Sequence, residues 1–260
     1  MNLSLAGMAL IVTGSTQGVG RAIALEAAGN GAEGIVVCGR DEARGQAVVA
    51  EVEAMGANAH LVVGDLSAQD APQRIADAAL ERFGRIDALV NAAGLTDRGS
   101  VAEAKPELWD RLYAVNARAP FFLMQKAIAD MRRRKSPGSI VNILSMNVHG
   151  GATDLAVYAS TKAALALLTR NAAHAHRFDR IRINGINVGW TDTPAERVMH
   201  ADTLGKGPDW LPQQAAQQPF GRLLVPEDIA RLALFLLSPA SEPMTGALID
   251  QEQSAVGPKD

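Results

Sequence analysis

The chain of 260 residues has few of the features that mark exported, membrane or nucleic-acid-binding proteins. Its single cysteine excludes an intrachain disulfide and a cysteine-based metal cluster, and is typical of a reducing compartment. The formal net charge of -3 provides no basic field, which disfavours nucleic acid as a partner. No apolar run reaches ~18 residues and no signal peptide opens the chain, so we expect no membrane span and a cytoplasmic location.

Clustered metal ligands are also missing. The five histidines include one close pair, His174 and His176, but residues two apart point to different sides of a helix. The other histidines are isolated and no HExxH motif occurs, so we predict no protein-bound catalytic metal.

Aromatic residues make up only 4% of a chain that is 48% hydrophobic, so the core must be aliphatic. Short apolar runs alternate with helical patterns, which predicts one α/β domain over residues 1–260: a doubly wound parallel sheet of Rossmann type with helices on both faces. Residues 195–220 lack a clear period, and a long irregular segment in a compact domain indicates a lid, here a substrate lid at about 190–220. The predicted strands are residues 8–12, 35–38, 60–63, 86–90, 138–144, 181–188 and 246–250. The predicted helices are residues 21–28, 41–55, 72–83, 106–134, 154–177 and 226–237, with a kink near Asn116.

A glycine-rich turn joins the first predicted strand to the first helix. Gly14, Gly18 and Gly20 are spaced Gly-x3-Gly-x-Gly, which differs from the commoner GxGxxG dinucleotide motif. Glycines let the backbone approach a diphosphate, and the amides at a helix start bind it. In such sheets ligands lie at the carboxyl ends of the strands.

The residues after the second strand bear on the choice of nucleotide. An acid there would bind a ribose 2'-hydroxyl, and an arginine would accept a 2'-phosphate. The chain has Gly39-Arg40-Asp41, so the guanidinium of Arg40 favours NADP over NAD, although Asp41 lies close enough to blur the signal.

A possible acid/base pair occurs in the fifth helix. Tyr158 and Lys162 are four residues apart and therefore share one helix face. A lysine cation beside a phenol lowers its pKa, which would make Tyr158 a general acid and base. Ser145, at the end of the preceding strand, could polarise a carbonyl oxygen beside it. By themselves, a tyrosine and a lysine four apart in an Ala-rich helix would more often be two surface residues.

In combination, these motifs resemble the short-chain dehydrogenase/reductase family over nearly the whole chain, from about Leu3 to Asp250. The motifs that carry the resemblance, in order, are Thr13-Gly14-x3-Gly18-x-Gly20, Asp65, Asn91-Ala92-Ala93-Gly94, Asn116, Ser145, Tyr158-x3-Lys162 and Gly189-x3-Thr193.

The resemblance implies an enzyme that transfers hydride between a nicotinamide cofactor and a carbonyl or secondary alcohol. It implies a catalytic tetrad of Asn116, Ser145, Tyr158 and Lys162, in which Asn116 holds a water that links Lys162 to solvent and Lys162 also binds the nicotinamide ribose. Asp65 would contact adenine, Asn91 the adenosine-side ribose, and residues 188–193 the nicotinamide carboxamide. The expected cofactor-binding residues are Gly14, Ser15, Thr16, Gln17, Gly18, Val19, Gly20, Arg40, Asp65, Leu66, Asn91, Ala92, Ala93, Gly94, Tyr158, Lys162, Gly189, Thr191 and Thr193.

Two departures from the family pattern stand out. Val188 replaces a usual proline before Gly189, and Gln251-Glu252 replaces a common Gly-Gly after Asp250. Family members are commonly tetramers built on the two long helices, here 106–134 and 154–177, so a homotetramer is expected, with less security because the tail differs.

The loops near Ser145 and Tyr158 are mostly polar, whereas a pocket for an acyl chain should be aliphatic. We therefore expect a small carbonyl or alcohol substrate such as a sugar, sugar acid or polyol. The candidate substrate residues are Asn147, His149, Trp190 and Glu196, with Asp192, Arg197 and His200 nearby.

Two alternatives stay open: a reductase of 3-oxoacyl thioesters on acyl carrier protein, and a nucleotide-binding regulator without chemistry. A carrier protein would need a basic surface near the site, but the cluster Arg132 to Lys135 lies at the far end of its helix and is expected to be a solvated helix end.

Overall fold

A single parallel sheet organises the computed structural model, which describes residues 3–256. The seven strands are ordered β3-β2-β1-β4-β5-β6-β7, and every neighbouring pair is parallel. This confirms the predicted fold class. The strands are β1 (Ala9–Thr13), β2 (Gly34–Gly39), β3 (Asn58–Val63), β4 (Ala88–Asn91), β5 (Gly138–Ile143), β6 (Ile181–Val188) and β7 (Leu248–Gln251).

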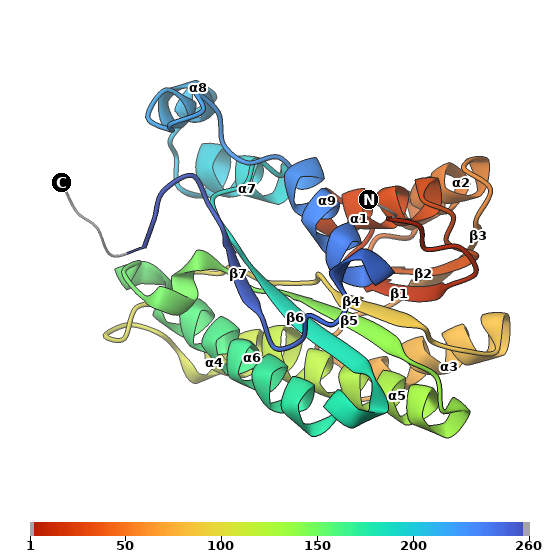
Figure 1. The fold of residues 1–260 in the computed structure, drawn as a ribbon. Coiled ribbons are helices and arrows are strands. Elements are labelled where there is room, and N and C mark those ends of the chain that lie inside the picture. Colours follow the sequence, from red (N-terminus) through yellow and green to blue (C-terminus); the bar gives the residue numbers. More distant parts are fainter. Residues whose placement is uncertain (1–2, 257–260) are drawn as a thin grey trace.

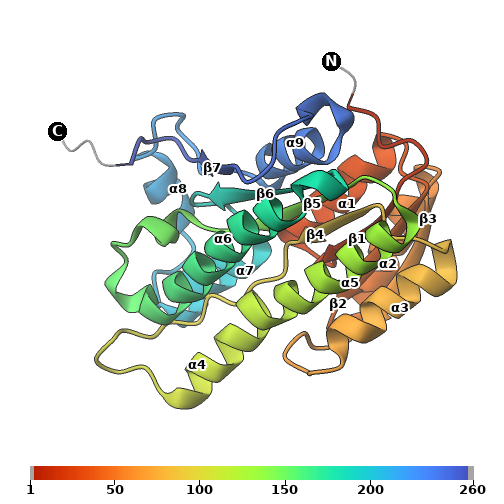
Figure 2. The same cartoon turned by 60° about the horizontal axis from the view of Figure 1, so that its bottom comes forward.

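Helices cover both faces of this sheet (Figures 1 and 2). Helices α1 (Gly18–Gly29), α2 (Glu42–Ala54) and α9 (Pro226–Leu237) lie on one side. On the other side lie α3 (Ala71–Phe83), α4 (Pro106–Tyr113), α5 (Ala119–Arg134) and α6 (Ala156–Ala175). None of the helices within residues 3–256 is long and apolar enough to cross a membrane.

Successive side chains of a strand point to opposite faces of the sheet and pack in two separate aliphatic cores. In β1, Leu10 and Val12 belong to the core under α1 and α9, whereas Ile11 belongs to the core under α3 and α5. Each of these three side chains is at most 1% exposed. Because strands buried on both faces need apolar residues at every position, they appear in the sequence as continuous aliphatic runs.

The kink expected near Asn116 takes the form of a π-helical turn. Residues Ala114–Arg118 form this turn between α4 and α5, so the long predicted helix is interrupted without leaving its axis. A π turn inserts an extra residue and occurs often at functional sites.

The segment expected to be irregular is partly helical. It contains α7 (Pro194–Val198), a π turn at Met199–Thr203 and α8 (Trp210–Ala215), each too short to produce a readable period. The ends of the segment are paired with each other: Leu224 N–H donates to Trp190 O at 3.0 Å, and Asp192 N–H donates to Leu224 O at 2.8 Å. Figure 1 shows α7 and α8 extending away from the sheet.

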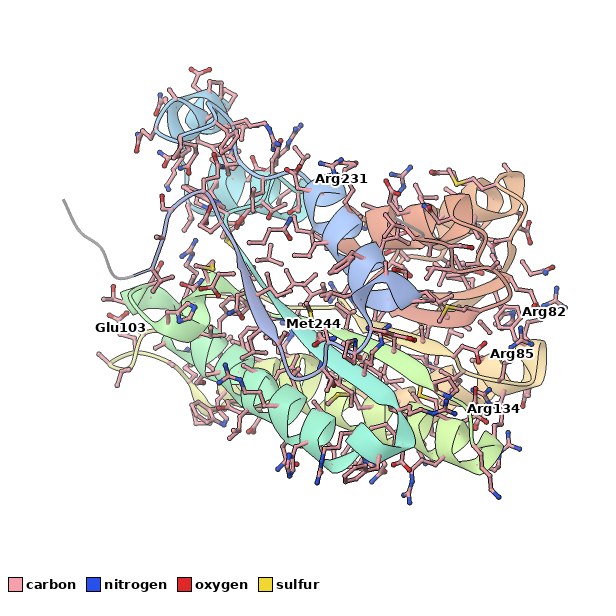
Figure 3. The ribbon with its side chains drawn as sticks, viewed as in Figure 1. Arg82, Arg85, Glu103, Arg134, Arg231 and Met244 are labelled. Atoms are coloured by element: carbon pink, nitrogen blue, oxygen red, sulfur yellow. The ribbon has the colours of Figure 1, made fainter. Side chains whose placement is uncertain are left out.

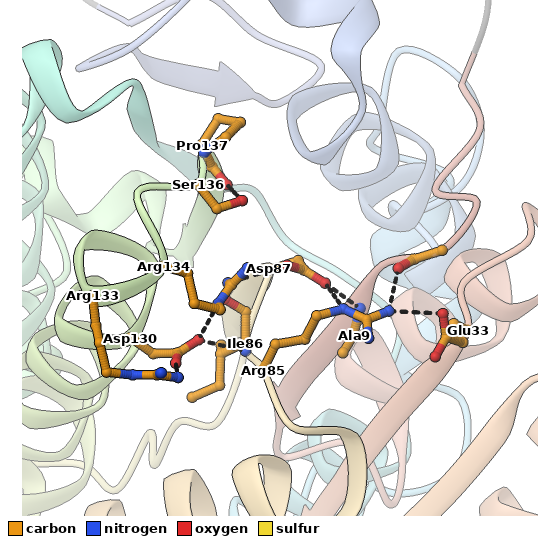
Figure 4. A network of polar contacts seen from close by, with 11 residues as sticks. Ala9, Glu33, Arg85, Ile86, Asp87, Asp130, Arg133, Arg134, Ser136 and Pro137 are labelled. Atoms are coloured by element: carbon orange, nitrogen blue, oxygen red, sulfur yellow. Dashed lines mark hydrogen bonds and ion pairs between the residues drawn. The ribbon is translucent and has the colours of Figure 1, made fainter.

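The basic cluster at the end of α5 is largely exposed, as expected of a solvated helix end, with the Arg132 and Arg133 side chains 59% and 66% exposed, but its arginines are also paired with acids. Arg134 donates to the buried Asp130 carboxylate at 2.8 Å and lies 3.1 Å from Asp87, while Arg133 donates to Asp130 at 2.5 Å. Arg85 extends the network from Asp87 to Glu33 (Figure 4). Figure 3 shows Arg85 and Arg134 together at one end of the molecule, opposite Glu103. The carboxylates of Asp130, Asp87 and Glu33 compensate the charges of these arginines. The ion pairs of Arg134 with Asp87 and of Arg85 with Glu33 join residues far apart in the chain, so the local sequence does not predict them.

Candidate active site

A cavity of about 980 Å³ opens at the carboxyl ends of the strands. The predicted residues that line it are Gly14, Thr16, Gln17, Gly18, Val19, Gly20, Arg40, Asp65, Leu66, Ala92, Ala93, Gly94, Ser145, Asn147, Tyr158, Lys162, Gly189, Trp190, Thr191, Thr193, Glu196 and His200. Loops that are far apart in sequence thus meet at one sheet edge, as the parallel topology requires.

The glycine turn at β1 brings backbone atoms unusually close together. A Cβ on Gly14 would lie 2.7 Å from the Ala93 Cα, and one on Gly20 would lie 2.4 Å from the Gly14 carbonyl oxygen. Gly18 begins α1 with a φ of 56°, a conformation that favours glycine. The turn therefore leaves a side-chain-free cradle at a helix N-terminus, and this fits the diphosphate of a dinucleotide.

Basic side chains line the cavity near the end of β2, where the sequence predicts that adenosine would bind. Arg40 and Arg74 both line the cavity. Asp41 does not: it caps α2, where its carboxylate accepts the Arg44 N–H at 2.9 Å and the Arg44 side chain at 2.6 Å. The Asp41 carboxylate, which made the choice between NADP and NAD ambiguous in the sequence, is therefore occupied as the N-cap of α2.

Three of the four residues of the expected tetrad meet at the opposite end. Tyr158 and Lys162 share one face of α6, and Ser145 follows β5. The Ser145 hydroxyl lies close enough to the Tyr158 phenol to lower the pKa of that phenol. All three are at most 8% exposed and line the cavity. This places two hydroxyl groups where a single substrate oxygen could contact both.

The Lys162 ammonium does not act on the phenol as predicted. It donates to the Ile143 carbonyl at 2.8 Å and lies 5.9 Å from the Tyr158 ring centroid. Burial raises the pKa of Tyr158 to about 12, which the nearby Ser145 hydroxyl opposes and the Glu196 charge reinforces. Burial lowers the pKa of Lys162 to about 8. The expected lowering of the phenol pKa is thus wrong for the protein alone, because desolvation of both groups dominates.

Asn116 lies in the π turn but its side chain does not line the cavity. Its amide makes three hydrogen bonds: Oδ1 accepts the Leu95 N–H at 2.9 Å, and Nδ2 donates to Leu95 O at 2.9 Å and to Thr161 at 3.1 Å. The side chain thus joins the loop after β4 to α6, beside Tyr158 and Lys162. It positions the other three residues, and its Oδ1 keeps a second lone pair beyond the one that accepts the Leu95 N–H.

Three further predicted residues have side chains that point elsewhere. Ser15 donates to Val12 O at 2.7 Å and accepts the Cys38 N–H at 2.9 Å, which joins β1 to β2. Asn91 donates to Asn142 at 2.8 Å inside the sheet. His149 contacts the Asp250 carboxylate at 3.1 Å. None of these side chains lines the cavity, and neither do Asp192 and Arg197, which pair with each other at 2.7 Å.

Aromatic rings form a wall at the Tyr158 end. The Trp190, His200 and Trp210 rings all contact one another, with centroid separations of 5.1 Å for Trp190–His200, 4.6 Å for His200–Trp210 and 6.0 Å for Trp190–Trp210. Burial, followed by the charges of Lys206 and Arg98, lowers the pKa of His200. Lys206 lies 3.1 Å from Nδ1 and can only donate there, which places the ring proton on Nε2.

Charged side chains complete this end of the cavity. Glu196 lies 3.7 Å from His200, and burial raises its carboxyl pKa. Arg98, Lys206 and Glu252 also line the cavity, and sequence reasoning missed all three as site residues. Of these three residues, only Glu252 could have been noticed in the sequence, because it occupies a position where the family pattern has glycine. Among residues 3–256 no group of three or more histidine, cysteine or acidic side chains could hold a metal ion.

Comparisons with known proteins agree with this arrangement. Residues 14–251 match the family described as enoyl-(acyl carrier protein) reductase. The short-chain dehydrogenase/reductase FrzI of a Cladobotryum species is 33% identical over 249 residues, which cover 95% of each chain.

Two solved structures share the fold closely. The L-sorbose reductase of Gluconobacter frateurii, complexed with NADPH and L-sorbose, aligns over 100% of both chains with a TM-score of 0.92 and 28% identity. A 3-oxoacyl (acyl-carrier-protein) reductase of Agrobacterium tumefaciens with NADP bound has a TM-score of 0.87 and 30% identity, covering 96% of this chain and 94% of that one. The family match, the full-length relative and the Tyr158 site agree, and the chain belongs to the short-chain dehydrogenase/reductase family of oxidoreductases.

Proposed function

We propose that this protein is an NADP(H)-dependent reductase of a carbonyl group on a hydroxylated small molecule, such as a sugar, sugar acid or polyol. The observation that carries the proposal is the pairing of Tyr158 and Ser145 with a polar wall made by Asn147, Glu196 and Lys206 in one cavity. The same residues serve the reverse oxidation of the alcohol.

The chemistry requires one hydride and one proton. A reduced nicotinamide bound in this cavity would supply the hydride. Tyr158 donates its proton to the carbonyl oxygen, which becomes the alcohol hydroxyl, and the Ser145 hydroxyl steadies that oxygen by a hydrogen bond. With a pKa of about 12 the phenol is protonated at neutral pH, so it is ready as an acid. The buried Lys162, at the same end, offsets the negative charge that Tyr158 acquires.

The preference for NADP rests on the end of β2. Arg40 lines the cavity, and Asp41 is held by Arg44. An acid in place of Gly39 is excluded by shape, because a Cβ there would lie 2.3 Å from the Thr16 methyl carbon. A guanidinium gains much from a phosphate dianion and little from a hydroxyl.

Arg40→Ala should therefore weaken NADPH binding by about tenfold or more and leave NADH binding within about twofold, because only the 2'-phosphate loses a partner. Dissociation constants from fluorescence titration measure both. Arg82→Ala, on α3 and outside the cavity, is the matched control. Equal losses for the two cofactors would show that Arg40 does not select between them.

The substrate class follows from the groups around Tyr158. Glu196 can accept hydrogen bonds from hydroxyl groups, Asn147 can donate and accept them, and the Trp190 ring offers an apolar face to a sugar ring. The likeness to a sorbose reductase supports this choice. A carrier-protein substrate has less support, because Arg133 and Arg134 are already paired with acids at the far end of the molecule. A regulator without chemistry has least support, since Ser145, Tyr158 and Lys162 meet in the cavity.

The test is a panel of ketoses, sugar acids, polyols, simple ketones and 3-oxoacyl thioesters, assayed with NADPH and with NADP. We expect the largest kcat/KM for a polyhydroxylated compound, because unpaired polar groups in the site penalise an apolar analogue. A larger kcat/KM for simple ketones or thioesters than for every sugar and polyol would overturn the substrate assignment. No turnover with any compound, despite cofactor binding, would favour the regulator.

We also propose a homotetramer built through α4, α5 and α6. Large apolar side chains are exposed on these helices: Trp109 is 47%, Phe121 41% and Leu167 70% exposed. Large exposed apolar side chains on neighbouring helices favour association with other copies. Light scattering should give a mass near four chains, and a monomeric mass would contradict the proposal.

A further inference from the structure

A carboxylate from the end of β7 lies against the turn after β6. Glu252 Oε2 accepts the Trp190 N–H at 3.0 Å, and Oε1 accepts the Gln253 N–H at 2.7 Å. A Cβ on Gly189 would lie 2.2 Å from Oε2, so the carboxylate sits directly over this glycine. Glu252 also lines the cavity that contains Tyr158.

The backbone that carries Glu252 is held on both sides. Gly189 N–H donates to Gln251 O at 2.9 Å. The Gln253 side chain accepts the Phe220 N–H at 3.0 Å and donates to Arg222 O at 2.7 Å. Glu252 therefore has a defined position, in contrast to an acid at a frayed end.

The charge of Glu252 has no cationic partner. None of the ion pairs found within residues 3–256 includes it. Its two hydrogen-bond donors are neutral backbone amides. The other charged groups at this end are Lys162, Lys206, Glu196 and Arg98, which is paired with Asp154 at 2.6 Å. Glu252 thus contributes to the cavity a negative charge that no ion pair within residues 3–256 neutralises.

The nicotinamide must lie at this end, because its hydride has to reach a carbonyl carbon whose oxygen contacts Tyr158. The oxidised nicotinamide ring carries a positive charge and the reduced ring is neutral. A fixed anion in a partly enclosed cavity attracts the first and has little effect on the second.

We propose that Glu252 makes the protein bind the oxidised cofactor more tightly, relative to the reduced cofactor, than the cavity would without it. The inference rests on the proposed function, since it requires NADP(H) in this cavity. By linkage, tighter binding of the oxidised form makes the bound reduced form a stronger hydride donor, which favours reduction of the substrate.

The two roles of the carboxylate can be separated by measuring both cofactor forms. Loss of its hydrogen bond to Trp190 should weaken both forms alike, whereas loss of its charge should weaken only NADP. The ratio of the two dissociation constants therefore reports the charge alone. Glu252→Gln keeps an acceptor for Trp190 and removes the charge, Glu252→Asp keeps the charge, and Glu252→Ala removes both.

The experiment is calorimetric titration of NADP and NADPH into the wild-type protein and the three variants. We expect Glu252→Gln and Glu252→Ala to raise the ratio Kd(NADP)/Kd(NADPH) by about five- to tenfold, and Glu252→Asp to change it less than about twofold. Glu81→Gln, an exposed acid on α3, is the control and should leave the ratio unchanged.

Normal binding with an unchanged ratio in Glu252→Gln would overturn this inference and leave the proposed function intact. An equal change in Glu252→Asp and Glu252→Gln would do the same, because charge would then not be the cause. A wild-type protein that binds neither form would overturn the proposed function itself, and this inference with it.

Discussion

Tyr158→Phe should reduce turnover by about 10³- to 10⁴-fold, because it removes the proton that the proposed mechanism gives to the substrate oxygen. The ring stays in place, packed with Leu112 and Val157, so the fold and the cofactor cavity should persist. Stopped-flow or steady-state oxidation of NADPH measures turnover, and fluorescence titration measures cofactor binding. We expect the NADPH dissociation constant to change less than about twofold.

The second tyrosine of the chain provides the control for this experiment. Tyr113 is in α4, its hydroxyl donates to Ser160 at 3.2 Å, and it does not line the cavity. Tyr113→Phe also loses a single hydroxyl and should keep near-normal turnover. If Tyr158→Phe retains a substantial share of activity, Tyr158 is not the proton donor and Ser145 or a water takes that role.

Arg182→Met should lower the free energy of unfolding by about 3 kcal/mol, because a buried charged hydrogen-bond donor is removed from several acceptors. Arg182 extends from β6 to the end of α9 and is 9% exposed. Its guanidinium donates to the carbonyls of Leu236 at 2.8 Å, Leu237 at 3.1 Å and Ser238 at 3.0 Å. These carbonyls form the negative end of the helix dipole, so the positive charge is neutralised there by carbonyls.

Urea unfolding followed by circular dichroism measures the change. Arg182→Lys keeps the charge but lacks the planar fork, so its loss should be intermediate. Arg170→Met, at an exposed position of α6, removes an arginine from the surface and should cost less than about 0.5 kcal/mol. A loss below about 1 kcal/mol for Arg182→Met would show that Ser139 and Ser241, which also donate to Leu236 O, satisfy the helix end without it.

The regular part of the fold could be predicted because its signals are periodic. The apolar run of β1, the recurring isoleucines of β6 and the four-residue spacing of Tyr158 and Lys162 depend only on local geometry. The location of the site at the carboxyl ends of the strands could be predicted from the alternation of strands and helices. The residues of α7 and α8 were missed because five or six residues do not complete two helical turns.

The direction of individual side chains could not be predicted. Asn91 is the last residue of β4, and a shift of one residue decides whether such a side chain enters the sheet or the cavity. Lys162 is on the expected face, but the sequence does not show that the Ile143 carbonyl competes for its ammonium. Glu252 lies 62 residues after the Trp190 amide that it contacts, so no local pattern connects them.

The contact between Gly39 and Thr16 constrains how this enzyme could change its cofactor in evolution. A single exchange of Gly39 for aspartate introduces the acid that NAD needs, but its Cβ would lie 2.6 Å from the Thr16 hydroxyl oxygen. A smaller residue at position 16 is therefore required first, or at the same time. Gly39→Asp alone, or a smaller residue at position 16 alone, would at best leave NAD binding unchanged. We expect the two substitutions to appear together in any descendant that prefers NAD.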